Sequence, residues 1–327
     1  MPEQEATRVA VVVRTKNRPL FLKRAVEDIL RQTYRGFRVV IVNDGGAPDA
    51  VDSVVAGFPA AARQHIATIH NGHSAGMEAA SNTGIQSCDS EYIVIHDDDD
   101  LWHPEFLERT VNYLDKSSDA GVVVRTRIRY EEIVDGEIRE TGSAPFWESL
   151  QQISLGEMLR INRAVPISFL YRRSLHDELG YFNETLPVCG DWEFNLRVLS
   201  RHRIGFLDGE PLAFWCQRPA AAGDDANSLF AKARDHERYD RSIRDEYLRR
   251  DLAGGGGLGI LLQVSAAMAE QEQELLENRR RMDQLQEQLA DSTRRLEDIM
   301  MARTSVLGRA GTAASRLVAA LRRGGRA

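Results

Sequence analysis

Apolar and polar positions alternate between two rhythms over the first 116 residues. Short runs rich in valine and isoleucine are typical of buried strands, and they cover residues 8–15, 38–44, 64–70 and 91–96. Between them, apolar residues recur at helical spacing in residues 18–33, 74–87 and 103–116. Pro19 suits the first turn of the first helix, and Ser74 is a candidate N-cap of the second. Strands that alternate with helices predict an α/β fold with a mostly parallel sheet.

The pattern is more mixed between residues 121 and 250. Residues 122–140 predict a hairpin that turns at Asp135-Gly136. The segments VPISFLYRRS and RIGFLDGEPLAFWCQR are typical of strands, GDWEFNLRVLS of a short helix, and residues 228–250 of a charged helix. The run AGGGG at residues 253–257 breaks the chain, so we place a domain boundary there.

A seven-residue rhythm follows the glycine run. It is carried by Met268, Leu275, Met282, Leu289 and Leu296, with Val264, Leu285, Ile299 and the polar Gln271, Asn278 and Ser292 at the companion position. Such a pattern predicts a parallel coiled coil over residues 264–300, and therefore a homo-oligomer, most simply a dimer. A lone amphipathic helix packed on the preceding domain is the alternative.

Charge is unevenly distributed along the chain. The net charge is −7, and residues 301–327 hold six arginines and no acid, so the rest of the chain carries −7 − 6 = −13. This balance does not favour nucleic acid as a partner. The basic end predicts an amphipathic tail that contacts an anionic membrane, with an unstructured terminus as the alternative.

Targeting and redox signals are weak. The acidic start is not typical of a signal peptide, and no apolar run reaches the ~20 residues that span a bilayer. The three cysteines, Cys88, Cys189 and Cys216, are far apart and form no CxxC. We therefore expect a cytoplasmic protein without a disulfide framework, attached peripherally at the inner face of the cell membrane through its tail.

Four consecutive carboxylates, Asp97 to Asp100, follow the strand at residues 91–96. Ligands of such sheets bind beyond the carboxyl ends of the strands. Clustered carboxylates there suit a hard cation, Mn²⁺ or Mg²⁺, that also binds substrate phosphates. A solvated acidic loop and a structural calcium site remain as alternatives.

Five segments in order resemble the family-2 glycosyltransferases of the GT-A fold. They are VVVRTKNRPLFLKRAVEDILRQTY, VVIVNDGG, NGHSAGMEAASNTGI, YIVIHDDDDLWHPEFLE and GDWEFNLRVL, and the resemblance covers about residues 8–218. It implies a Rossmann-like GT-A domain over residues 1–253, with a donor half at about 8–116 and an acceptor half at about 117–253. A glycine-rich linker at 254–263, the coiled coil and the tail at 301–327 then complete the chain.

The resemblance also implies an activity. The family transfers a sugar, with inversion, from a nucleotide diphosphate donor to an acceptor hydroxyl. The expected acceptor is a saccharide or a lipid-linked saccharide in bacterial surface polysaccharide synthesis, and the expected cofactor is Mn²⁺ or Mg²⁺. Two alternatives are a non-catalytic coiled-coil assembly factor with a degenerate domain and a sugar nucleotidyltransferase. The latter usually has a glycine-rich loop after its first strand, which RTKNRPL lacks.

The residues expected to bind the donor follow from the family motifs. Those expected to contact the nucleotide are Thr15, Asn17, Asp44, Asn82, Asp97 and Asp98. Asp99 is the expected metal ligand, with Asp97 as a second metal or ribose contact. Asp98 and Asp100 can instead lie behind the metal ligands or in solvent. Arg218 is either a phosphate contact or a surface arginine.

Asp191 is the expected general base, with a plain helix N-cap as the alternative and Glu193 as the fallback carboxylate. Trp192 is expected to pack or to line the acceptor cleft, and Cys189 is interpreted as a packing residue. The chain departs from the family pattern at three positions. Arg14 replaces a proline, Ser81 replaces an arginine, and Gly190 replaces the acid that precedes the base.

Overall fold

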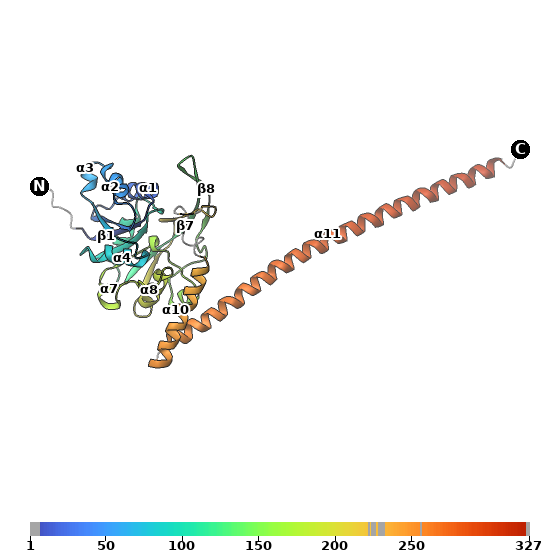
Figure 1. The fold of residues 1–327 in the computed structure, drawn as a ribbon. Helices are drawn as coiled ribbons and strands as arrows, with labels where there is room; N and C mark the ends of the chain where they lie inside the picture. The colour runs from blue at the N-terminus through green and yellow to red at the C-terminus, as the bar shows by residue number, and fades with distance from the viewer. Residues whose placement is uncertain (1–6, 222, 224–226, 228–232, 256, 325–327) are drawn as a thin grey trace. The chain divides into compact units, whose positions relative to one another are not determined.

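The computed structural model describes residues 7–221, 223, 227, 233–255 and 257–324, with the side chains of these residues except Ala233 and those after Leu296. The chain divides into two compact units, Met1–Ala266 and Ala267–Ala327. The first holds both sheets, and the second consists of most of one long helix (Figure 1).

Seven strands form the main sheet, in the order β10-β6-β9-β4-β1-β2-β3. Their bounds are β1 Val9–Thr15, β2 Phe37–Asp44, β3 Ile66–Asn71, β4 Tyr92–Asp97, β6 Gly121–Val124, β9 Phe169–Arg172 and β10 Ile204–Leu207. Neighbours pair in parallel except β9, which is antiparallel to both β4 and β6. The predicted α/β class and mostly parallel sheet are therefore confirmed.

Helices cover both faces of this sheet (Figure 1). One face carries α1 Pro19–Ile29, α2 Pro48–Ala56 and α5 Phe106–Asp115. The other carries α4 Met77–Gln86, α6 Leu155–Arg160, α7 Ser174–Leu179, α8 Gly190–Leu199 and α10 Ala233–Gly254. Successive side chains of a strand point to opposite faces, so Val11 joins one apolar cluster and Val12 the other. A short helix, α3 Ala60–Arg63, precedes β3.

A second sheet has the order β5-β11-β7-β8. It consists of β5 Leu101–Trp102, β7 Thr126–Val134, β8 Glu137–Pro145 and β11 Ala213–Gln217. The predicted turn at Asp135-Gly136 is confirmed, because both residues have positive φ angles of 54° and 79°. The predicted hairpin was too long at its start, since β6 leaves it to join the main sheet. This second sheet brings residues 213–218 beside the acidic run after β4.

The predicted serine cap of α4 is wrong. The helix begins at Met77, and its N-cap is Gly76, with a φ of 102°. The Ser74 hydroxyl instead donates a 2.7 Å hydrogen bond to Asp44 Oδ2. Because Asp44 ends β2, this bond ties the loop before α4 to the edge of the sheet where the site lies.

The boundary after the first unit lies later than expected. The glycine run does separate α10 from α11 Leu258–Gly324, but helix resumes at Leu258, so the predicted linker over 254–263 is too long. Leu262 is fully buried in the same apolar cluster as Ile243 of α10. The first turns of α11 therefore belong to the first unit, which runs to Ala266.

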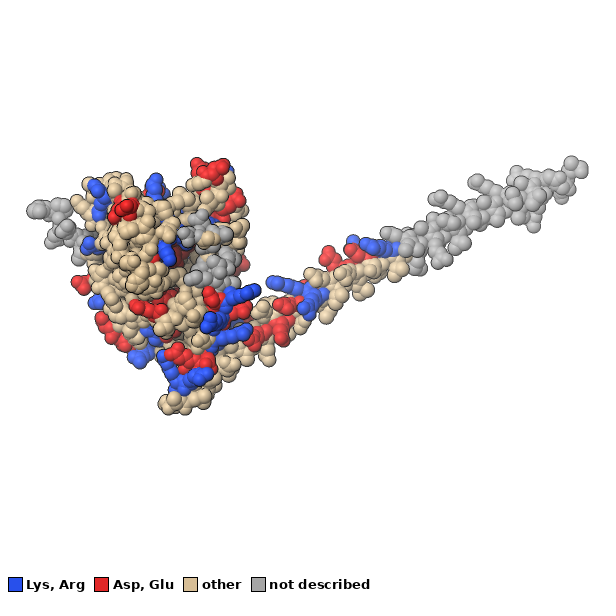
Figure 2. Space-filling view, in the orientation of Figure 1, with Lys and Arg blue, Asp and Glu red and all other residues tan. Residues whose placement is uncertain are grey.

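In the second unit, α11 continues as helix through the predicted coiled coil and through Gly308 and Gly311 to Gly324. The side chains of the predicted basic tail lie outside those that the structure describes. Within the described part, the heptad residues Met268, Leu275, Met282, Leu289 and Leu296 are 57–68% exposed. Acidic and basic side chains alternate along the same stretch (Figure 2). None of the helices in the described ranges is long and apolar enough to cross a membrane.

Candidate active site

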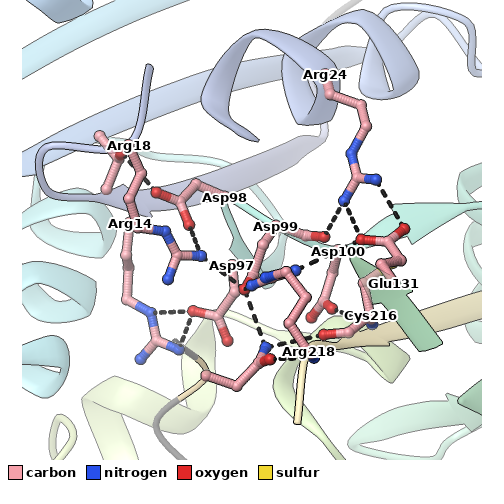
Figure 3. Close-up of polar contacts among 12 residues, drawn as sticks. Arg14, Arg18, Arg24, Asp97, Asp98, Asp99, Asp100, Glu131, Cys216 and Arg218 are labelled. Carbon is pink, nitrogen blue, oxygen red and sulfur yellow. Dashed lines mark hydrogen bonds and ion pairs between the residues drawn. The ribbon is translucent and has the colours of Figure 1, made fainter. Parts of the chain in front are cut away.

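The four carboxylates Asp97 to Asp100 lie at the carboxyl end of β4, beside the end of β1. Asp98, Asp99 and Asp100 are buried, whereas the side chain of Asp97 is 32% exposed. Arginines surround the run (Figure 3). Guanidinium groups therefore neutralise most of the negative charge of the run.

Two of these arginines come from β1 and the loop that follows it. Arg14 faces Asp97 across the β1–β4 pair, and its Nε donates a 3.0 Å hydrogen bond to Asp97 Oδ1. Asp98 accepts a 2.7 Å hydrogen bond from the Thr15 hydroxyl and lies 2.6 Å from Arg18 Nη2. Asp97 and Asp98 are thus held by the segment that the sequence analysis expected to contact the nucleotide.

Asp99 is the most heavily bound member of the run. Its Oδ2 lies 2.6 Å from Arg18 Nη2, accepts a 3.1 Å hydrogen bond from Asn227 Nδ2, and pairs with the Arg218 guanidinium. Arg24 Nη2 donates to the Asp99 backbone carbonyl at 2.7 Å. These contacts fix both the side chain and the backbone of Asp99.

The four carboxyl groups are therefore not equivalent. Burial acts to raise the pKa of Asp99, but Arg18 and Arg218 outweigh it and hold the pKa below its ordinary value. Burial raises the pKa of Asp98 to about 7. Burial and the charge of Asp99 raise the pKa of Asp100 well above its usual range, and Asp100 accepts the Cys216 N–H at 2.8 Å. Asp99 is thus the fixed negative charge of the run.

The sequence analysis left the place of Arg218 open and missed Arg18, Arg24 and Glu131. Arg218 is 1% exposed, so it is not a surface arginine, and it also lies 3.5 Å from Glu131. Arg24 pairs with the same glutamate at 2.7 Å. Glu131 lies on β7 of the second sheet, and no local motif marks it. The position of Arg18 one residue after Asn17 is the one signal that could have suggested a role.

The acid run offers two oxygens to a divalent cation. Asp97 Oδ2 and Asp99 Oδ1 receive no hydrogen bond from the described residues, because every contact above uses the other oxygen. Within the described ranges, no cluster of three acidic, histidine or cysteine side chains could hold an ion by itself. The donor set fits Mn²⁺ or Mg²⁺ bound by one or two carboxylates together with substrate phosphates.

Asp44 has a firm structural role at the end of β2. Its two oxygens accept from Ser74, Asn71 and the backbone N–H groups of Ala75 and Gly76, at 2.7–3.2 Å. Burial alone would raise the pKa of Asp44, but these hydrogen bonds lower it. They also occupy the four acceptor positions of the carboxylate. Contact of Asp44 with a base stays a prediction.

Asn82 and Asn17 differ in how firmly hydrogen bonds hold their side chains. Asn82 is buried, and its amide donates to the Phe182 carbonyl and to Glu184 and accepts the Phe182 N–H, at 2.8–3.0 Å. These bonds give Asn82 a structural role, and its contact with a nucleotide stays a prediction. Asn17 is exposed, with a φ of 56°, and its Oδ1 accepts the Ala47 N–H at 3.2 Å.

The candidate base Asp191 lies in the first turn of α8. Its Oδ2 accepts a 2.7 Å hydrogen bond from Asn162 Nδ2, and burial raises the pKa of Asp191 above its ordinary value. The N-cap of α8 is Cys189, with no side-chain capping bond, so the plain-cap alternative is wrong. A cavity beside Asp191 is also lined by Arg14, Glu78, Asn195 and apolar side chains.

The neighbours of Asp191 in sequence are structural. Glu193 pairs with Arg197 at 2.8 Å and accepts the Tyr247 hydroxyl at 2.9 Å, so it links α8 to α10. Trp192 is buried and donates its Nε1–H to the Met158 carbonyl. The Cys189 thiol lies 3.4 Å from His236 Nδ1, a partner that the sequence did not suggest. Burial and Asp191 raise the pKa of Cys189 to about 12, so the thiol keeps its proton.

The family of the chain follows from comparison with known proteins. The model of "Glycosyl transferase family 2" matches residues 10–180, which hold β1 to β9 and the acid run. The chain belongs to glycosyltransferase family 2. It is 30% identical over 275 residues to the Bacillus subtilis protein named "Uncharacterized glycosyltransferase YwdF", covering 82% of this chain and 91% of the relative. The protein is therefore an enzyme, a glycosyltransferase.

Solved structures share the glycosyltransferase fold. S. aureus TarS 1-349 in complex with UDP-GlcNAc matches 74% of this chain and 66% of that one, with a TM-score of 0.55 and 18% identity. The mannosyltransferase PcManGT from Pyrobaculum calidifontis, in complex with GDP-Man and Mn²⁺, matches 81% of each chain with a TM-score of 0.51 and 16% identity. At these identities the likeness concerns the fold.

The three departures from the pattern that the resemblance implies are linked through Glu78, which lies 3.8 Å from Arg14 and beside Gly190. Arg14, at the place of a proline, donates from Nη1 to Ser81 Oγ at 3.3 Å, and Ser81 stands where the pattern has arginine. A Cβ atom built on Gly190 would lie 2.4 Å from the Glu78 carboxyl carbon. The guanidinium group of Arg14 therefore lies beside Ser81, where the pattern has an arginine. The carboxyl group of Glu78 lies beside Gly190, where the pattern has an acid.

Proposed function

We propose that this family-2 glycosyltransferase transfers a sugar, with inversion, from a nucleoside diphosphate donor to an acceptor hydroxyl. The observation that carries the proposal is the double contact of Arg14. Its guanidinium bonds Asp97 on the donor side and lines the cavity that holds Asp191. The diphosphate region and the candidate base are therefore adjacent, as direct displacement at one carbon requires.

On the donor side, Thr15, Asn17, Asp97 and Asp98 are the residues proposed for the nucleotide. Asp99, with Asp97, is proposed to hold Mn²⁺ or Mg²⁺ through the oxygens that accept no hydrogen bond. Such an ion, when bound, neutralises the charge of a departing diphosphate. Arg18 and Arg218 keep Asp99 ionised and oriented. The complexes of TarS with UDP-GlcNAc and of PcManGT with GDP-Man support a nucleotide sugar as the donor.

On the acceptor side, Asp191 is proposed to take the proton of the attacking hydroxyl. Burial gives its carboxylate a proton affinity above that of an exposed aspartate, which suits a base that works near neutral pH. Asn162 orients the carboxylate through its bond to Oδ2. The remaining oxygen, Oδ1, accepts no side-chain hydrogen bond from the described residues.

The cellular setting proposed for the reaction is bacterial surface polysaccharide synthesis on a saccharide or lipid-linked acceptor. In this setting α11 forms a parallel homodimer through its exposed heptad residues, and the basic end contacts an anionic membrane at the inner face of the cell membrane. The exposed leucines and methionines of the described part of α11 support the first half of this proposal.

A donor screen tests the reaction. The full-length protein is mixed with UDP-, dTDP- and GDP-sugars, Mn²⁺ and simple saccharide acceptors, and nucleoside diphosphate release is measured. Product from one donor is expected, and NMR should show that its anomeric configuration is inverted. Binding of a nucleotide sugar without any turnover would overturn the catalytic proposal and favour a non-catalytic assembly role. Retention of configuration would overturn the role of Asp191.

A further inference from the structure

Glu78 is a buried carboxyl group that the proposed mechanism does not yet use. It lies in the first turn of α4, is 4% exposed, and lines the same cavity as Asp191. Gly190, which precedes Asp191, leaves open the space that the Glu78 carboxyl group fills. Two carboxyl groups from different helices therefore share one side of the cavity.

The charges around Glu78 decide whether its carboxyl group is ionised or neutral. The charged or titratable groups that act on it are Arg14 of β1, Asp97 at the end of β4, Tyr171 of β9, and Cys189 and Asp191 at the start of α8. Arg14 bonds Asp97 at 3.0 Å, whereas its nearest contact with Glu78 is 3.8 Å, beyond hydrogen-bond reach. Arg14 thus neutralises Asp97 first. Burial raises the pKa of Glu78 to about 8, so near pH 7 Glu78 is mostly neutral.

We propose, on the basis of the proposed transfer reaction, that Glu78 is a positioning residue of the acceptor site. As a neutral carboxylic acid, it supports the first turn of α8 through the space beside Gly190. It also leaves Asp191 as the single carboxylate of the cavity that can take the acceptor proton. Two ionised carboxylates in this cavity would repel each other and draw Arg14 away from Asp97.

A double-mutant cycle tests the shared space without an activity assay. Gly190→Ala adds a Cβ that meets Glu78, so it should lower Tm by several degrees in the wild-type protein. It should cost far less in the Glu78→Ala protein, where the space is open. Gly156→Ala is the control, because a Cβ there meets no atom within 4 Å. Equal losses from Gly190→Ala in both backgrounds would overturn the placement of Glu78.

Kinetics then test the positioning role. Glu78→Ala should lower kcat by about 10- to 100-fold through a misplaced Asp191, with a much smaller effect on donor KM. Glu78→Gln, a neutral match of the protonated side chain, should lose much less near pH 7 and should lack the fall in kcat expected of the wild-type enzyme above pH 8. Gln86→Ala, an exposed change on the same helix, is the control.

Failure of this inference differs from failure of the proposed function. If the wild-type protein turns over no donor, the function fails and the positioning role falls with it. If the wild-type protein is active and Glu78→Ala keeps its kcat and its pH profile, only the role of Glu78 is overturned. Rescue of Glu78→Ala by Gly190→Glu, which returns a carboxyl group to the same space from α8, would support the inference further.

Discussion

Two groups of carboxylates lie at the same edge of the sheet and have opposite surroundings. Asp97, Asp98 and Asp99 contact the guanidinium groups of several arginines (Figure 3), whereas Glu78 and Asp191 share a cavity in which Arg14 is the lining arginine. Both groups are largely buried. Burial alone therefore does not decide the charge of a carboxyl group. Asp99, which contacts both Arg18 and Arg218, has a lowered pKa, whereas its buried neighbours Asp98 and Asp100 have raised ones.

We propose that this difference separates binding from proton transfer. Arginines hold the pKa of Asp99 low, which yields a permanent charge for a cation or for the orientation of a diphosphate. Burial raises the pKa of Glu78 to about 8 and the pKa of Asp191 above its ordinary value, so both carboxyl groups hold a proton more readily than exposed ones. Enzymes commonly assign different roles to paired carboxylates by such differences in environment.

The largest expected effect comes from the base. Asp191→Asn keeps the size of the side chain and removes its ability to take a proton, so transfer should fall by about 100- to 10,000-fold. Donor binding, measured by calorimetry, should persist. Tm should change little, because the amide oxygen of Asn can still accept the hydrogen bond from Asn162 Nδ2. A variant that loses stability yet keeps its specific activity would make Asp191 a purely structural residue.

Asp99→Asn should have the next largest effect. It removes the fixed charge opposite Arg18 and Arg218, so turnover should fall by about 100- to 1,000-fold, and added Mn²⁺ should restore little. The matched control is Asp100→Asn, because a carboxyl group with a strongly raised pKa carries little charge to lose. Equal losses in both variants would show that the two acids are not distinguished by their arginines. Full activity of Asp99→Asn after chelator treatment would remove the metal proposal.

A smaller effect concerns the pH dependence of stability. Glu78 binds its proton up to about pH 8 in the folded protein but releases it near pH 4.5 when unfolded. Between these values the folded state holds more protons, so the free energy of unfolding should fall as pH rises from about 4.5 to 8. Glu78→Gln should flatten this fall, as measured by urea unfolding at several pH values. A wild-type curve with the same slope as the variant would contradict the buried neutral form.

The sequence predicted which segments form the site, but it did not predict most contacts between their side chains. Apolar runs placed β1, β2 and β4, and the acids at their ends marked the correct edge, because parallel strands end together. The resemblance at residues 190–199 suggested Asp191 as the base, a role that stays a proposal. Glu131 and Asn227 could not be found, because they join the site only through the fold. Glu131 shares Arg218 with Asp99, and Asn227 bonds Asp99 from a distant part of the sequence. Compensation between Gly190 and Glu78 was hidden for the same reason.

Local signals also misled at two boundaries. Ser74 has the residue type of an N-cap, but the stronger demand of the Asp44 carboxylate takes its hydroxyl. The glycine run does break the helix, but apolar Leu258 and Leu262 continue to cover α10 after it. A composition change marks where helix is interrupted, whereas burial decides where a folding unit ends.

The smallest effect on catalysis is expected from loss of the second unit, because both carboxylate groups lie in Met1–Ala266. A version that ends at Ala266 should keep kcat for a soluble acceptor, whereas one that ends at Ala253 should be less stable because Ile243 loses its contact with the Leu262 region. By analytical ultracentrifugation, full-length protein should be a dimer and the Ala266 version a monomer.

Vesicles complete this test. Six arginines per tail, at about 1 kcal/mol for each basic residue near an anionic surface, should bind the dimer to phosphatidylserine vesicles at low salt, and 0.5 M salt should release it. Leu275→Lys with Leu289→Lys places charges on the heptad seam and should weaken both dimer formation and binding, since pairing doubles the tails engaged. Lys substitutions at the outward Gln273 and Gln284, which lie away from the heptad seam, are the control. Monomeric full-length protein that ignores vesicles would refute the coiled coil and the tail together while leaving the contrast between the two carboxylate groups untouched.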